Sequence, residues 1–183
     1  MWLGFSNNAR RIVFEAQEFA AGSGTLRIDT EHLLAALLQH ADKSRIWPPA
    51  PTDRIDAGDT AAFILRKIGV DLSALCTQIE QEIRLTDARL PLPAGLTSEV
   101  QKVINLSYEE ARSLGHSTVG LEHLLLGLVR EENGMAGRVL RQCGVGLEAV
   151  RSIAVHLPPG SIARAAEKTP GQKKRTIWQH LFG

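Results

Sequence analysis

An internal repeat is the feature of this sequence that most constrains its fold. A shift of 91 positions places Glu31-His32-Leu33-Leu34 on Glu122-His123-Leu124-Leu125. The alignment runs without a gap from Ser6 on Thr97 to Leu37 on Leu128. Further along, the shift becomes 75 and places residues 61–70 on residues 136–145, so the first copy holds 16 additional residues. The chain must therefore build one supersecondary unit twice.

The first segment of each copy has the apolar spacing of a helix with one buried face. A hydroxyl residue, Ser6 or Thr97, stands in front of it and can accept hydrogen bonds from the free amides of the first turn. A glycine, Gly24 or Gly115, ends the pattern. Each stripe recurs every three or four residues, as a core-facing helix requires: Ala9, Ile12, Val13, Ala16, Phe19 and Ala20, and Val100, Val103, Ile104, Ser107, Ala111 and Leu114.

Three further helices are expected in each copy. The second, over about 30–39 and 121–132, is rich in leucine on nearly all sides and belongs deep in the core. The third follows Asp59 or Asn133 as its N-cap and ends at Gly69 or Gly144, where a left-handed residue is expected. The fourth covers about 72–85 and 147–157, and no segment has the period of a strand. The pattern predicts an all-α, eight-helix pseudo-twofold bundle made of two four-helix repeats.

The repeats also set the expected boundaries. The first repeat spans residues 5–88 and carries an inserted loop at 40–58, where the Trp47-Pro48-Pro49 run cannot continue a helix. A proline-containing linker at about 84–95 leads to the second repeat at 96–157. Residues 158–183 are basic and end in an apolar stretch. They are interpreted as a flexible basic C-terminal tail, and the alternative is a short docking peptide.

Charge and motif content exclude several function classes. Lys and Arg number 21 against 20 Asp and Glu, a net charge of +1, so nothing global directs the chain to nucleic acid or an anionic membrane. No Gly-x-x-x-x-Gly-Lys-Ser/Thr loop for nucleotide phosphates is present. No nucleophile and base have catalytic spacing, so no enzyme is expected, and an unrelated hydrolase is the least favoured class.

Metal, redox and export signals are equally weak. Cys76 and Cys143 stand alone without ligand spacing and occupy different repeat positions, so packing roles are favoured. His32 and His123 each follow a glutamate at the start of a leucine-rich helix, where a buried structural imidazole is favoured over a metal ligand. No metal or cofactor is expected. Neither a secretory signal nor a membrane-length apolar run occurs, and a cytoplasmic location is expected.

The motifs together resemble the N-terminal domain of the Clp (Hsp100) unfoldases, closest to the ClpC type, over residues 5 to about 157. They are the stretch 5–13 (FSNNARRIV), the stretch 28–34 (IDTEHLL), the stretch 111–128 (ARSLGHSTVGLEHLLLGL) and the stretch 134–140 (GMAGRVL). In that family two such repeats form a domain that binds substrates and adaptor proteins and delivers them to ATPase rings. The resemblance therefore implies a recognition module without ATPase modules.

The start of the second helix in each copy is the candidate site. A helix N-terminus suits an anion, and a first-turn glutamate suits a guanidinium, so one end can accept both charges of a phosphorylated arginine. In ClpC-type domains the matching region is a phosphoarginine pocket, and the resemblance assigns Thr30 and Glu31 to one pocket and Glu122 to the other. The alternative is that the glutamates only complement the helix dipole and Thr30 only caps.

The chain departs from the family pattern Gly-Thr-Glu-His in both copies. Asp29 replaces the glycine in the first and adds a charge that repels phosphate, whereas Leu121 replaces the hydroxyl residue in the second. Two functions follow as hypotheses. The first is a free-standing protein-recognition module of the Clp system, which binds an unfoldase, a protease subunit, an adaptor or a substrate protein. The second is the detached N-terminal substrate-binding domain of a ClpC-type unfoldase.

Overall fold

The structure is a computed structural model, and it describes residues 4–39, 60–87 and 95–157. The expected inserted loop at 40–58 and the expected tail at 158–183 lie outside the described residues. In the described part the first repeat forms α1 (Asn7–Gly22), α2 (Thr30–Gln39), α3 (Thr60–Ile68) and α4 (Leu72–Asp87). The second forms α5 (Ser98–Ser113), α6 (Leu121–Arg130), α7 (Met135–Gln142) and α8 (Leu147–Ala154). The expected all-α bundle is therefore confirmed.

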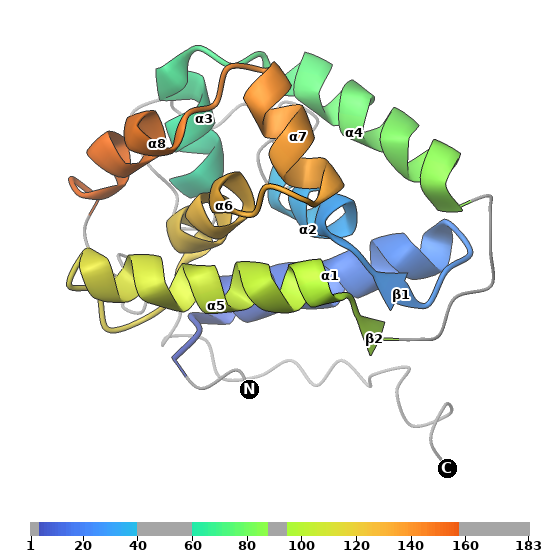
Figure 1. Cartoon of the computed structure of the whole chain (residues 1–183), viewed down its shortest axis with the longest axis horizontal. Helices are drawn as coiled ribbons and strands as arrows, with labels where there is room; N and C mark the ends of the chain where they lie inside the picture. Colours follow the sequence, from blue (N-terminus) through green and yellow to red (C-terminus); the bar gives the residue numbers. More distant parts are fainter. Residues whose placement is uncertain (1–3, 40–59, 88–94, 158–183) are drawn as a thin grey trace, which may run out of the picture.

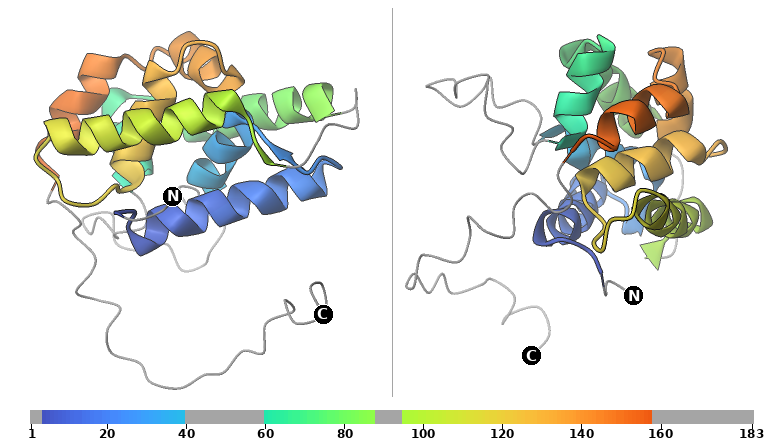
Figure 2. Two further views of the ribbon diagram at one scale, coloured as in Figure 1. Left: turned by 60° about the horizontal axis from the view of Figure 1, so that its bottom comes forward. Right: turned by 90° about the vertical axis from the view of Figure 1, so that its left-hand side faces the viewer.

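The two leucine-rich helices lie at the centre. Helices α1 and α5 run along one side of the bundle, α3, α4, α7 and α8 cover the other, and α2 and α6 lie between them (Figures 1 and 2). Residues 33–38 of α2 and 124–128 of α6 are buried. The buried apolar side chains of both repeats form one continuous cluster, so the repeats fold around a shared core.

The predicted helix starts are borne out where a hydroxyl cap was expected. The Ser6 side chain accepts a hydrogen bond from the Ala9 amide, and that of Thr97 accepts one from the Val100 amide, each at 3.2 Å. Gly69 and Gly144 follow α3 and α7 with φ of +92° and +77°, the left-handed conformation expected of glycine there.

Four helix ends differ from the sequence prediction. Asn133 is not the N-cap of α7, because Gly134 takes that position. The buried Glu131 carboxylate accepts from both of their amides, and the Thr30 hydroxyl accepts from the amide of Ala136 in the first turn. Helix α6 accordingly stops at Arg130, where the extended Glu131 follows. Helix α4 continues to Asp87, and α8 ends already at Ala154.

Two short strand pairings join the repeats, although no strand was expected. Strand β1 (Arg27–Ile28) pairs in parallel with β2 (Gly95–Leu96), and Phe5 forms a parallel bridge with Val119. The pairings are equivalent under the shift of 91, since Ile28 aligns with Val119 and Phe5 with Leu96. Each repeat therefore contributes one segment to each pairing. Such short strands carry no detectable period, so the sequence could not indicate them.

None of the helices in the described ranges is both long and apolar enough to cross a lipid bilayer.

Candidate functional site

The starts of α2 and α6 share one hydrogen-bonded turn. The Nδ1 atom of His32 accepts from the Asp29 amide at 3.0 Å, and that of His123 accepts from the Gly120 amide at 2.8 Å. Both imidazoles are buried, with exposed fractions of 1% and 0%. They act as capping side chains for the residue before each helix. Both imidazoles are therefore buried, as expected, and take part in the local fold of the two helix starts.

Thr30 lies at the contact between the repeats. Its hydroxyl donates to the Glu31 carboxylate at 3.4 Å and accepts from the Ala136 amide at 3.3 Å. Ala136 is in the first turn of α7, and the amide of Gly134, the N-cap of that helix, donates to Glu131. Thr30 is fully buried and Glu31 is 2% exposed. The first candidate position thus supports the N-terminus of a helix from the other repeat.

Glu122 makes the reciprocal contact on the other side. Its carboxylate accepts from the Thr60 hydroxyl at 2.8 Å, at the start of α3, and lies 3.2 Å from His123 Nδ1. It is 5% exposed. The Thr30 and Glu31 side chains contact each other, whereas Glu122 contacts α3 and His123. All three side chains are buried, and whether they bind a ligand in two pockets stays a prediction.

A histidine pair extends the second site towards the surface. The Nδ1 atom of His116 lies 2.8 Å from His123 Nε2, and His116 is partly exposed. Burial, more than any neighbouring charge, lowers the pKa of His123 below its ordinary value. Ligand atoms of His116, Glu122 and His123 lie within 4.8 Å of one another. His116 contacts the Nε2 atom of His123, and the Glu122 carboxylate contacts the Nδ1 atom of the same ring.

An open apolar surface lies elsewhere in the described part of the chain, along α1 and the β1–β2 pair. A groove of about 640 Å³ is lined by Arg10, Val13, Phe14, Leu26, Ile28 and Leu96 among others. Phe14 is 40% exposed and Leu26 is 66% exposed, although both are large apolar side chains. Exposed apolar side chains gathered in one depression are typical of a binding surface. We call this depression the apolar groove.

Sequence reasoning missed the apolar groove, although the repeat held a signal for it. Under the shift of 91, Phe14 aligns with Asn105 and Leu26 aligns with Ser117. The second repeat therefore has polar residues where the first exposes apolar ones. These two exposed apolar side chains are therefore not part of what the two repeats share.

Residues 95–175 match the family model of the Clp repeat (R) N-terminal domain. The chain is 34% identical over 154 residues to the chaperone protein ClpB of Oceanobacillus iheyensis, covering 84% of this chain and 17% of that one. It is 34% identical over 153 residues to the negative regulator of genetic competence ClpC/MecB of Bacillus subtilis, with the same coverage. The chain thus spans about a fifth of the length of these relatives or less.

Solved structures share the fold. The N-terminal domain of Hsp104 from Candida albicans matches with a TM-score of 0.61 at 14% identity, over 83% of this chain and 89% of that one. The N-terminal domain of the chaperone ClpD from Arabidopsis thaliana matches with a TM-score of 0.57 at 19% identity, over 85% and 94%.

Proposed function

Because the chain carries a Clp N-terminal domain, we propose that it is a protein-recognition module of the Clp chaperone and protease system, which binds an unfoldase, adaptor or substrate protein. The apolar groove supports this proposal most directly. Two apolar side chains that line it, Phe14 on α1 and Leu26 next to β1, are 40% and 66% exposed. Their burial against a partner would release ordered water and stabilise the complex.

The expected occupant is a short apolar segment of a partner protein. Val13, Ile28 and Leu96 line the groove between the exposed side chains, and Arg10 provides a charge at its edge. A few apolar side chains set into such a depression commonly carry most of the binding energy. The chain would therefore act as a receptor surface and perform no chemistry itself.

A peptide-binding assay tests the apolar groove. Fluorescence anisotropy would follow a labelled leucine-rich peptide titrated with the full chain, with the double variant Phe14→Ser and Leu26→Ser, and with Val155→Ser. Val155 is 53% exposed on the opposite side of the bundle and serves as the control. We expect the double variant to bind about tenfold more weakly. Equal affinity for all three proteins would refute the role of the groove.

The alternative is that the chain is the detached N-terminal substrate-binding domain of a ClpC-type ATP-dependent unfoldase. The partial coverage of ClpB and ClpC/MecB supports it, because the chain aligns with less than a fifth of either protein. Reading the gene beyond the codon for Gly183 separates the two hypotheses. A continuing frame with a phosphate-binding loop would establish the alternative.

Phosphoarginine binding at Thr30, Glu31 and Glu122 stays a prediction. Their side chains are almost entirely covered, so a ligand would have to displace contacts to α7 or α3. Calorimetry with free phosphoarginine should give saturable heat for the full chain and none for Glu31→Ala plus Glu122→Ala. The absence of heat from the unmodified chain would remove the hypothesis.

A further inference from the structure

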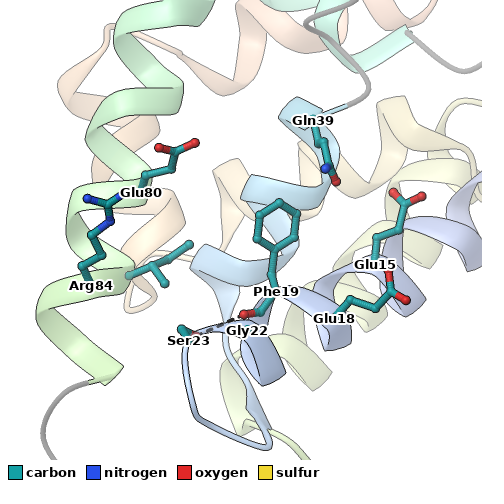
Figure 3. A pocket seen from close by; sticks show the side chains of 9 residues that line it. Glu15, Glu18, Phe19, Gly22, Ser23, Gln39, Glu80 and Arg84 are labelled. Carbon is teal, nitrogen blue, oxygen red and sulfur yellow. Dashed lines mark hydrogen bonds between the residues drawn. The ribbon is translucent and has the colours of Figure 1, made fainter.

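A second groove lies between α1, the end of α2 and α4, and its chemistry differs from that of the apolar groove. It encloses about 520 Å³. Figure 3 shows Phe19 projecting from α1 into the space that faces α4. Ile83, buried on α4, completes the apolar floor. We call this depression the acidic groove, because Glu15, Glu18 and Glu80 stand around it with a single cation, Arg84.

The second repeat fills the equivalent place with an ion-pair cluster. Phe19 aligns with Glu110, Gln39 with Arg130, and Cys76 with Arg151. Glu110 is 1% exposed and accepts from Arg130 at 2.9 Å and from Arg151 at 2.6 and 3.0 Å. These bonds tie α5, α6 and α8 together. The first repeat has Phe19, Gln39 and Cys76 at these three positions and so cannot form this cluster.

The length of α4 also separates the repeats. Helix α8 ends at Ala154, which aligns with Ile79, whereas α4 continues to Asp87. Glu80, Ile83 and Arg84 therefore lie on helical turns of α4 that have no helical counterpart in the second repeat. The wall of the acidic groove is thus an extension of α4 that the second repeat lacks as helix, and its Ile83 packs in the core.

The charges of the acidic groove are largely available to a ligand. Glu18 and Glu80 are exposed and form no ion pair within the part of the chain that the structure describes. Glu15 is paired with Arg11 at 2.7 Å, on the exposed side of α1. Carboxylates around an apolar floor attract cationic side chains and exclude acidic segments.

We propose that the acidic groove binds a cationic and apolar segment of a partner protein, in which lysine or arginine flanks a large apolar side chain. The apolar side chain packs on Phe19 and Ile83, and the cations meet Glu18 and Glu80. This site is separate from the apolar groove, so the module has two surfaces with different preferences. The charge complementarity identifies the ligand class.

Anisotropy with a labelled short peptide of alternating lysine, leucine and serine tests the proposal on the full chain. The variant Glu15→Gln, Glu18→Gln, Glu80→Gln should bind about tenfold more weakly at low ionic strength, since exposed ion pairs each contribute modestly. The control is Glu109→Gln, Glu132→Gln, Glu148→Gln, which removes the same charge from exposed positions of the second repeat. It should bind within about twofold of the unmodified chain. Equal weakening by both variants would overturn the proposal.

Amide NMR shifts locate the peptide. We expect the peptide to shift the amide signals of Phe19, Gly22 and Ile83. We also expect the double variant Phe14→Ser and Leu26→Ser to bind this peptide as the unmodified chain does. Failure of the acidic groove can therefore be distinguished from failure of the apolar groove. Shifts confined to the apolar groove would overturn the proposal. A further test replaces the basic stretch 173–175 by serine and records the spectrum without peptide. If this change shifted the same amide signals, the chain itself would be the occupant of the acidic groove, and the proposal would be overturned.

Discussion

Replacing Gly127 by alanine should destabilise the protein, although alanine is the better helix former. Gly127 lies where α6 crosses α5, and a methyl group there would come within 2.6 Å of the Val103 carbonyl oxygen and still closer to Ser107 Oγ. The Ser107 hydroxyl is held in place by its bond to the same carbonyl at 2.8 Å. One of the two obstacles is backbone, so α5 and α6 must move apart.

Two opposing contributions set the change in the free energy of unfolding for Gly127→Ala. Alanine for glycine in a helix interior contributes about 1 kcal/mol of stability. Overpacking of a close contact costs about 1–3 kcal/mol. The cost wins because both contacts are far below van der Waals separation, and we expect a net loss of about 1–2 kcal/mol. In the first repeat the aligned positions are Ala16 and Ala36, both fully buried.

The first repeat therefore suggests the compensating change. Ser107→Ala in the Gly127→Ala background recreates the alanine pair and removes the closer obstacle. We expect it to restore about 1 kcal/mol, while Ser107→Ala alone changes stability by less than this. Urea unfolding of the four proteins gives the coupling free energy. A more stable Gly127→Ala single variant, or no coupling, would show that propensity dominates and refute the packing argument.

Three further changes test the buried polar contacts. Thr30→Val removes the acceptor for the Ala136 amide and should lower the free energy of unfolding, measured with urea, by about 1 kcal/mol. Thr77→Val, at an exposed position of α4, serves as the control. Burial raises the pKa of Glu110, but its arginine partners outweigh burial and hold the pKa below the ordinary value. Glu110→Gln should therefore lower the free energy of unfolding by about 2 kcal/mol at neutral pH. The difference in stability between the two proteins should shrink as the pH falls below about 4.5. Because the pKa of His123 is lowered by burial, the unfolded chain binds that proton first. Stability should thus fall as pH drops below about 6.5, and His123→Gln should flatten the profile.

The sequence predicts the elements that depend on local chemistry. Hydroxyl caps such as Ser6 and Thr97 and the terminal glycines Gly69 and Gly144 act within one turn, so their effect is readable from the chain. The Asn133 cap was predicted wrongly because Glu131 accepts from the amides of Asn133 and Gly134, while the Thr30 hydroxyl of the other repeat accepts from the first-turn amide of Ala136. A competing side chain of this kind is not visible in local spacing.

The candidate site was only partly predictable for a different reason. The sequence places Thr30 and Glu122 at helix starts, but it does not reveal that α7 and α3 of the opposite repeat cover them. That covering depends on how the repeats exchange contacts. The exchange is a long-range property of the packed bundle, as are the two parallel pairings around Ile28 and Val119.

Comparison of the two copies separates folding from binding within one chain. Where the fold needs a residue, both repeats keep it, as with the capping imidazoles of His32 and His123. At Phe14 and Phe19 the first repeat has apolar side chains, whereas the second has Asn105 and the ion-paired Glu110. The shared fold is therefore compatible with either kind of side chain at these positions. Both proposed grooves lie where the copies differ in this way, and such positions are where one half of a duplicated domain can carry a recognition surface that the other half lacks.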